Sequence, residues 1–235
     1  MKKLITIMSL ALITNIAIAS SEINVGFKSK LIEQGALTGT NLVTAGASAQ
    51  LGSFGLAVDT FSSFKDNAGI LQSNSGIFKR VDVTAGYKFT STLADVTVGG
   101  VYANASKSFA LGGVKSNVLP FIKVGGKVFA SLPWHVKAVV DNKNNNTNVE
   151  GNLELPFPVG LGKLKVVPSV GAGFNSKSAD VFAVRNNDKY FAGGLGLSYP
   201  SPIGTLRGDV FVASTGFSLD AKKSYGYNVG VSHAF

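Results

Sequence analysis

The sequence predicts an all-β fold, a transmembrane up-and-down barrel of about twelve antiparallel strands. First, 45% of the 235 residues are hydrophobic and 15% are charged, yet after residue 19 no segment approaches the roughly 20 apolar residues of a membrane helix. Second, apolar residues alternate with small or polar ones over segments of about ten residues, which is the period of a strand with one apolar face. Third, short turns and longer loops alternate between these segments, as up-and-down strands require.

The strands are predicted in order from this alternation. In the first, 22–32, Val25 and Phe27 share one face while Gly26 and Lys28 share the other. The others span 41–51, 54–64, 77–90, 94–104, 117–130, 134–141, 149–157, 163–175, 189–199, 205–215 and 224–235. The longer segments between them, 65–76, 105–116, 142–148, 176–188 and 216–223, are predicted to be extracellular loops, and the Asn-rich run 142–148 to be a solvated one. The short turns then lie at the periplasmic end.

The distribution of charge supports one face in lipid and one in water. Only Lys79 and Lys189, both next to a loop, fall on the apolar parity of the strands, whereas the opposite parity carries ten basic and eight acidic residues. A charge on the lipid face near the membrane midplane costs about 2 to 4 kcal/mol. A soluble sandwich would also bury its apolar face, but strands of about ten residues are nearly twice as long as the usual globular strand.

The first 19 residues read as a cleaved secretory signal peptide. Lys2 and Lys3 precede an apolar stretch that ends in Ala17-Ile18-Ala19, an A-x-A cleavage pattern. The mature chain, 20–235, is then a single exported barrel domain. The absence of Cys excludes disulfides, thiolate metal sites and a lipidated cysteine. The net charge of +9 comes without a basic run, so we expect no nucleic-acid partner.

The last strand carries the clearest resemblance to a known family. It alternates apolar and small residues and ends on Phe235, and it resembles the closing strand of bacterial outer-membrane β-barrels. The resemblance implies an outer-membrane, porin-like protein whose last strand is read by the barrel-assembly machinery, with an assembly signal formed by Tyr227, Val229, Val231, His233 and Phe235. The segments Val25 to Lys30, Gly35 and Gly46 are similar to the first hairpin of TorF-type porins, although Glu33-Gln34-Gly35 stands where that group has Arg-Gly.

The inward parity supplies the candidate functional residues. Twelve strands lie between barrels filled by side chains and barrels with an open channel, and many inward positions are Gly, Ser or Thr, which favours a water-filled lumen. The predicted pore-lining residues are Lys88, Lys123, Lys127, Lys137, Lys163, Lys165, Arg207, Asp95, Glu154 and Asp209. Because basic residues exceed acidic ones in this set, we expect a weak preference for anions. Alternatively, these charges pair across strands and only hydrate the wall.

The sequence therefore predicts a channel for passive diffusion of small hydrophilic solutes, in contact with outer-membrane lipid and lipopolysaccharide. The alternative is a non-conducting barrel that serves as an adhesin or scaffold. An enzymatic function would need a base, and the two histidines, His135 and His233, have no carboxylate or metal-ligand pattern beside them. The segment 160–163 lacks the first Gly and the Ser or Thr of a phosphate-binding loop. We therefore expect no catalysis, metal or cofactor.

Overall fold

The structure is a computed structural model that describes residues 20–33, 36–63, 79–105, 116–128, 132–142, 146–159, 163–176, 180–181, 184–185, 189–214 and 223–235. The predicted signal peptide, and nearly all of the predicted loops 65–76, 105–116 and 216–223, lie outside these residues. Within the described ranges, no helix is long and apolar enough to cross a membrane.

The described residues form a closed barrel of twelve long antiparallel strands. They are β1 (Ser20–Glu33), β2 (Ala36–Leu51), β3 (Phe54–Ser63), β4 (Lys79–Thr90), β5 (Asp95–Ala105), β6 (Ser116–Val128), β7 (Leu132–Asp141), β8 (Asn146–Glu154), β10 (Lys165–Asn175), β13 (Lys189–Ser201), β14 (Gly204–Ser214) and β15 (Lys223–Ala234). Three two-residue strands are β9 (Phe157–Pro158), β11 (Asp180–Val181) and β12 (Val184–Arg185).

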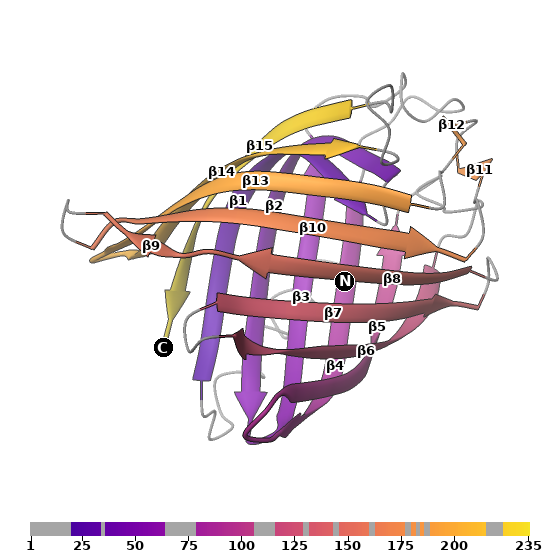
Figure 1. Cartoon of the computed structure of the whole chain (residues 1–235), viewed down its shortest axis with the longest axis horizontal. Helices are drawn as coiled ribbons and strands as arrows, with labels where there is room; N and C mark the ends of the chain where they lie inside the picture. The colour runs from indigo at the N-terminus through magenta and orange to yellow at the C-terminus, as the bar shows by residue number, and fades with distance from the viewer. Residues whose placement is uncertain are drawn as a thin grey trace, which may run out of the picture.

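Each long strand pairs with its neighbour in the chain, and β15 pairs with β1 to close the barrel. Figure 1 shows β7, β8, β10 and β13 crossing in front of β1 to β5. The turn between β2 and β3 and the C-terminus mark one end of the barrel, here called the turn end; β11 and β12 lie at the other, the loop end (Figure 1). The predicted fold class is confirmed.

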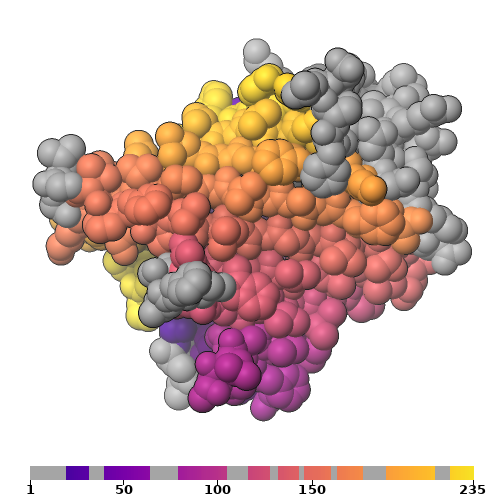
Figure 2. Space-filling view, viewed as in Figure 1, coloured from indigo at the N-terminus to yellow at the C-terminus, as the bar shows by residue number. Residues whose placement is uncertain are grey.

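The outer face of the barrel is apolar. In β15, Tyr225, Tyr227 and Val229 are exposed, whereas the residues between them are half-buried. In Figure 2 the side chains of β8, β10 and β13 form a continuous outer surface. Aromatic side chains gather near the turn end, where Phe54 is opposite Tyr87 and the rings of Tyr87 and Phe89 lie 4.8 Å apart. An exposed apolar band with aromatic side chains near its rim is the surface that a lipid bilayer covers.

Several predicted boundaries differ from the structure. The first hairpin is longer than predicted, because β1 runs to Glu33 and β2 begins at Ala36. The segment 142–148 is not entirely a loop: β8 begins at Asn146, because inward positions of a barrel strand accept polar side chains as readily as a loop does. The predicted strand 149–157 is interrupted at Leu155-Pro156, where proline supplies no N–H donor to the ladder. The predicted loop 176–188 contains the small β11–β12 hairpin.

Candidate functional site: the lumen

The lumen-facing side chains follow from the ladders, because residues directly opposite each other on neighbouring strands point to the same face. Thr97 of β5 is opposite Lys123 of β6, and Lys123 is opposite Lys137 of β7. Lys137 is in turn opposite Glu150 of β8. This row faces the interior, since Thr97 and Glu150 line internal cavities. It therefore sets two lysines of like charge in register on the inner wall.

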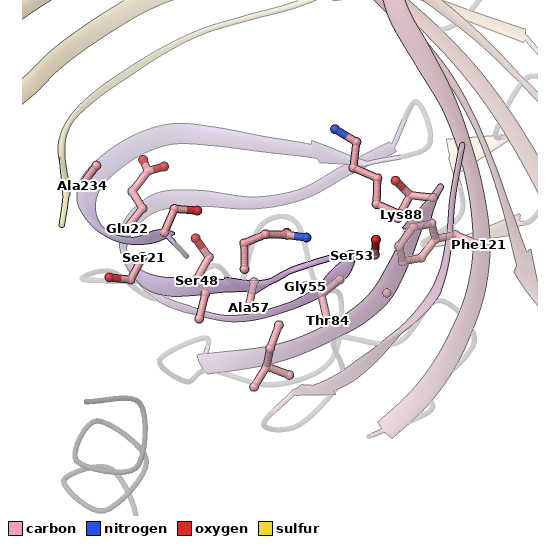
Figure 3. A pocket seen from close by; sticks show the side chains of 16 residues that line it. Ser21, Glu22, Ser48, Ser53, Gly55, Ala57, Thr84, Lys88, Phe121 and Ala234 are labelled. Carbon is pink, nitrogen blue, oxygen red and sulfur yellow. The ribbon is translucent and has the colours of Figure 1, made fainter. Parts of the chain in front are cut away.

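One cavity, of about 380 Å³, lies at the turn end of the lumen. Its lining is dominated by small and hydroxylated side chains, with few charges. Figure 3 shows Ser21 and Glu22 of β1 on one side of it and Lys88 and Phe121 on the other. Its further lining residues include Ser48, Gln50, Ser53, Thr84 and Thr97. Such a lining holds water readily, as a hydrophilic pathway requires.

A second cavity, of about 360 Å³, crosses the middle of the barrel. Residues of β1 and residues of β7 and β8 line the same space, although these strands lie on opposite sides of the sheet order. Its polar and charged lining residues include Lys28, His135, Glu150, Asp209 and Asn228. Asn228 donates a 2.8 Å hydrogen bond from Nδ2 to Oδ2 of Asp209 on the neighbouring strand.

Three inward aromatic rings each lie over a glycine of the neighbouring strand. Phe121 is opposite Gly99, Tyr190 is opposite Gly173, and Phe211 is opposite Gly226. In each pair, a Cβ atom added to the glycine would meet the ring. The rings thus occupy the space that a side chain would fill on the wall, an arrangement that supports glycine in strands. They lie along the wall instead of crossing the lumen.

Another inward ring, that of Phe61, contacts two basic side chains through its face. Lys28 Nζ lies 5.7 Å from its centroid, and Arg80 Cζ lies 5.5 Å from it. Arg80 also forms a two-point ion pair with Asp82, with Nε–Oδ1 and Nη2–Oδ2 distances of 2.6 Å, and both residues are buried. Lys137 makes the equivalent contact with Phe121, its Nζ 5.3 Å from the ring centroid. Cation–π contacts hold these basic side chains near the wall.

A hydrogen-bonded amide network covers the inner wall of β8, β10 and β13. Asn148 and Asn175 are 1% and 2% exposed, and Asn148 Nδ2 donates to Asn175 Oδ1 at 3.0 Å and to the Tyr190 hydroxyl oxygen at 3.1 Å. The Tyr190 hydroxyl donates to Glu150 Oε2 at 3.0 Å. The composition of residues 142–148 concealed this network, but the alternation of Asn146, Asn148, Glu150 and Asn152 would have indicated an inward strand face.

Seven of the ten predicted pore-lining residues fall into three groups. Lys123, Lys137 and Glu154 share the inward parity of β6, β7 and β8. Lys165 and Arg207 both lie opposite Ser198, so they share one row near the turn end. Lys127 is exposed on β6, whereas Lys163 lies in the turn before β10 instead of on the wall.

Pairing accounts for some of these charges. Lys88 Nζ forms a 2.7 Å ion pair with Asp95 Oδ2, and Asp209 accepts the hydrogen bond from Asn228. That these residues line a conducting path stays a prediction.

The two histidines lie in different environments, and neither belongs to a metal-binding group of described residues. No group of three or more His, Cys, Asp or Glu side chains there is arranged to hold a metal ion. His135 faces the lumen among Lys123, Lys137 and Glu150. His233 is on the exposed turn end of β15, where its ring packs on Phe235 at 4.7 Å and its Nδ1 lies 3.3 Å from the Ile203 carbonyl oxygen.

Comparison with solved structures identifies barrels of the same fold. No protein-family model and no curated protein sequence matches the chain. The structure described as "KdgM porin" is similar with a TM-score of 0.57 and 13% identity, covering 92% of this chain and 99% of that one. The NanC porin structure is similar with a TM-score of 0.51 and 10% identity, covering 90% and 98%. At this identity the likeness concerns the fold: the chain has the fold of a porin-like transmembrane β-barrel.

Proposed function

We propose that the chain is an outer-membrane channel through which small hydrophilic solutes diffuse passively. The observation that carries the proposal is the placement of the inward aromatic rings over Gly99, Gly173 and Gly226, which keeps bulky side chains against the wall. Polar cavities remain at the turn end and in the middle of the lumen. The likeness to porin structures supports the same reading.

A weak preference for anions is the finer part of this proposal. Lys123 and Lys137 are in register on the inner wall, and Lys165 and Arg207 share a row near the turn end. Rings of like charge set the sign of the ions that a pore favours. The ion pairs Lys88–Asp95 and Arg80–Asp82 reduce the number of free charges and keep the preference weak.

Export, location and assembly complete the proposal. The predicted signal peptide directs the chain across the inner membrane, and the apolar outer face fits the outer membrane. The residues of the predicted assembly signal lie on or directly after β15, with Phe235 72% exposed. Basic residues of the predicted loops, such as Lys107, Lys115 and Lys143, are proposed contacts for lipopolysaccharide phosphates. Membership of the TorF-type group also stays a prediction.

Liposome swelling tests passive diffusion. Liposomes containing the refolded mature chain should swell at rates that fall with solute size across a series of neutral sugars and amino acids. The double variant Lys123→Gln/Lys137→Gln should admit a monovalent organic anion more slowly than the parent and leave the neutral sugars unchanged. Lys189→Gln, which removes an exposed lysine on the outer-face parity of β13, opposite Phe174, is the matched control. Folding is checked by heat-modifiable migration on a gel. Absence of swelling with a folded chain would contradict the proposal.

A non-conducting scaffold or adhesin is the second candidate, and the buried inner wall favours it. The amide network of Asn148 and Asn175 is almost fully buried, and Leu31 and Leu42 form a small internal cluster with Phe61. Inner-wall side chains that water does not reach are expected where a lumen is closed. If folded protein leaves liposomes impermeable to every solute of the series, this candidate replaces the channel.

A further inference from the structure

The main-chain ladder between β1 and β15 is incomplete at the loop end. Its pairs run from Glu22–Ala234 to Lys28–Asn228, although β1 continues to Glu33 and β15 begins at Lys223. On their other sides both strands stay paired, β1 with β2 up to Glu33 and β15 with β14 from Lys223. Beyond Lys28, the Tyr227 amide donates a 2.7 Å hydrogen bond to the Ser29 side-chain oxygen. The Ser29 hydroxyl thus accepts the hydrogen bond that a backbone carbonyl of β1 would accept in a regular ladder.

The β1–β2 hairpin is irregular at this point. The register of the hairpin shifts between Leu31 and Ile32, and Asn41 adopts a φ of 51°, in the left-handed region that asparagine tolerates. Alternation would place Leu31 on the outer face with Val25 and Phe27. Leu31 is instead 8% exposed, packs with Leu42, and lines the central cavity of the lumen. The irregularity of the hairpin therefore lies where the ladder between β1 and β15 has ended.

A cavity of about 890 Å³ occupies this region. On one side it is lined by β1 and β2, and on the other by β13, β14 and β15. It shares Lys30, Gly193 and Phe211 with the central cavity, and it also reaches Leu195, Val210 and Tyr225, which are 49%, 58% and 65% exposed on the outer face. The cavity thus adjoins both the lipid-facing surface and the lumen. Its volume lies within the roughly 300 to 1,000 Å³ of small-molecule sites.

The two sides of the cavity differ in chemistry. The β13–β15 side is apolar, with Leu195, Val210 and Val212, whereas the β1–β2 side offers Ser29, Thr40, Asn41 and the Lys30 ammonium group. Lys30 forms no ion pair with a described residue. A ligand that satisfies both sides has an alkyl chain and one negatively charged head, since an apolar wall binds the chain and an unpaired ammonium group binds the anion.

We propose that the gap between β1 and β15 is a side entrance that binds a single-chain anionic amphiphile of the fatty-acid class. Its alkyl chain lies against β13–β15 and its carboxylate lies at Lys30, between the membrane and the lumen. This inference goes beyond the diffusion of hydrophilic solutes and does not depend on conduction. It requires only that the barrel lies in a membrane and that the gap is open.

The absence of Cys from the chain allows the gap to be tested by disulfide formation. If the ladder continued in register, Leu31 would be opposite Tyr225; in the closed part, Val25 is opposite Val231. The pair Val25→Cys/Val231→Cys should cross-link nearly completely on mild oxidation, and the pair Leu31→Cys/Tyr225→Cys at least about tenfold less, because a disulfide requires Cα atoms closer than about 7 Å. Equal cross-linking of two folded pairs would overturn the proposal.

Binding is measured with a fluorescent dansyl-labelled undecanoate titrated into barrels in lipid nanodiscs, with empty nanodiscs subtracted. Parent protein should bind it saturably. Lys30→Gln should weaken binding about tenfold or more, the usual loss on removing a charge-assisted bond. Val210→Trp, which fills the apolar side, should also weaken it, whereas Lys165→Gln at the turn end should not. Absence of saturable binding, or equal affinity of parent and Lys30→Gln, would overturn the proposal. Ion conduction is not a readout, so a failed channel proposal would leave this test intact.

Discussion

Two regions of the barrel satisfy their backbone hydrogen-bonding groups in different ways: the wall of β8, β10 and β13, and the junction of β1 with β15. On the wall, the main-chain ladders continue to the pairs Asn148–Asn175 and Phe174–Lys189 at the loop end. The side-chain amides of Asn148 and Asn175 add a hydrogen bond between β8 and β10. At the junction, the ladder ends at Lys28–Asn228 and a serine hydroxyl accepts the next amide. Backbone groups in a membrane must be satisfied internally. Two strands of a barrel can therefore begin to separate where a side chain accepts the next backbone amide.

The largest effect is expected on the wall, from Gly173→Ala. The Tyr190 ring occupies the position of the new Cβ, so the ring must leave the network of Asn148 and Glu150. We expect a loss of about 1 to 3 kcal/mol in the free energy of unfolding, the usual range for overpacking, measured by urea unfolding in lipid vesicles. Gly100→Ala is the matched control, because the nearest atom to its Cβ is 4.0 Å away. Equal stability of the two variants would contradict the packing of Tyr190 on Gly173.

A somewhat smaller effect is expected from Asn148→Ala. The substitution removes the donor for Asn175 and Tyr190 and leaves Asn175 Oδ1 with fewer partners, which should destabilise the barrel by about 1 to 2 kcal/mol. Asn104→Ala, on an exposed asparagine of β5, should change the unfolding free energy by less than about 0.5 kcal/mol. The same urea titration measures both. Equal, small changes in unfolding free energy for the two variants would show that the network does not stabilise the barrel.

Backbone amide hydrogen exchange can locate the end of the ladder at the junction of β1 and β15. The amides of Tyr227 and Phe235 both donate toward β1, so the two-residue period of a strand directs the Tyr225 amide to the same edge. Because the ladder has ended there, the Tyr225 amide should exchange at least about tenfold faster than that of Val229, which lies opposite Phe27. Residue-resolved NMR in micelles provides the rates. Equal protection at the two positions would mean that the ladder continues to the loop end.

The smallest effect is expected from Ser29→Ala. Loss of the hydroxyl removes the acceptor of the Tyr227 amide, so the exchange of that amide should accelerate while the unfolding free energy falls by about 1 kcal/mol or less. Ser21→Ala is the control, because Ser21 accepts the Phe235 amide through its backbone carbonyl and the substitution keeps that bond. Unchanged exchange at Tyr227 in Ser29→Ala would show that the hydroxyl is not the closing partner.

The strand number and the two faces could be predicted because each side chain in a barrel strand faces either lipid or lumen, so the period of two is visible in the sequence. Contacts that depend on the exact register of neighbouring strands, or on one backbone conformation, could not be predicted. The packing of Tyr190 on Gly173 depends on register, and the irregular backbone at Asn41 depends on a left-handed φ that asparagine permits but does not require. The predicted loop 142–148 is wrong for residues 146–148, because polar composition is typical of a solvated loop and of an inward strand face alike.

The central claim, a continuous water-filled lumen, is tested most directly by single-channel recording of the refolded mature chain in a planar bilayer with a salt gradient. We expect steady conductance steps and a reversal potential that favours anions in the parent, and a reversal potential closer to zero in Lys123→Gln/Lys137→Gln. A folded, heat-modifiable barrel that gives no steps would contradict the open lumen. A reversal potential that favours cations would contradict the role of the basic rows.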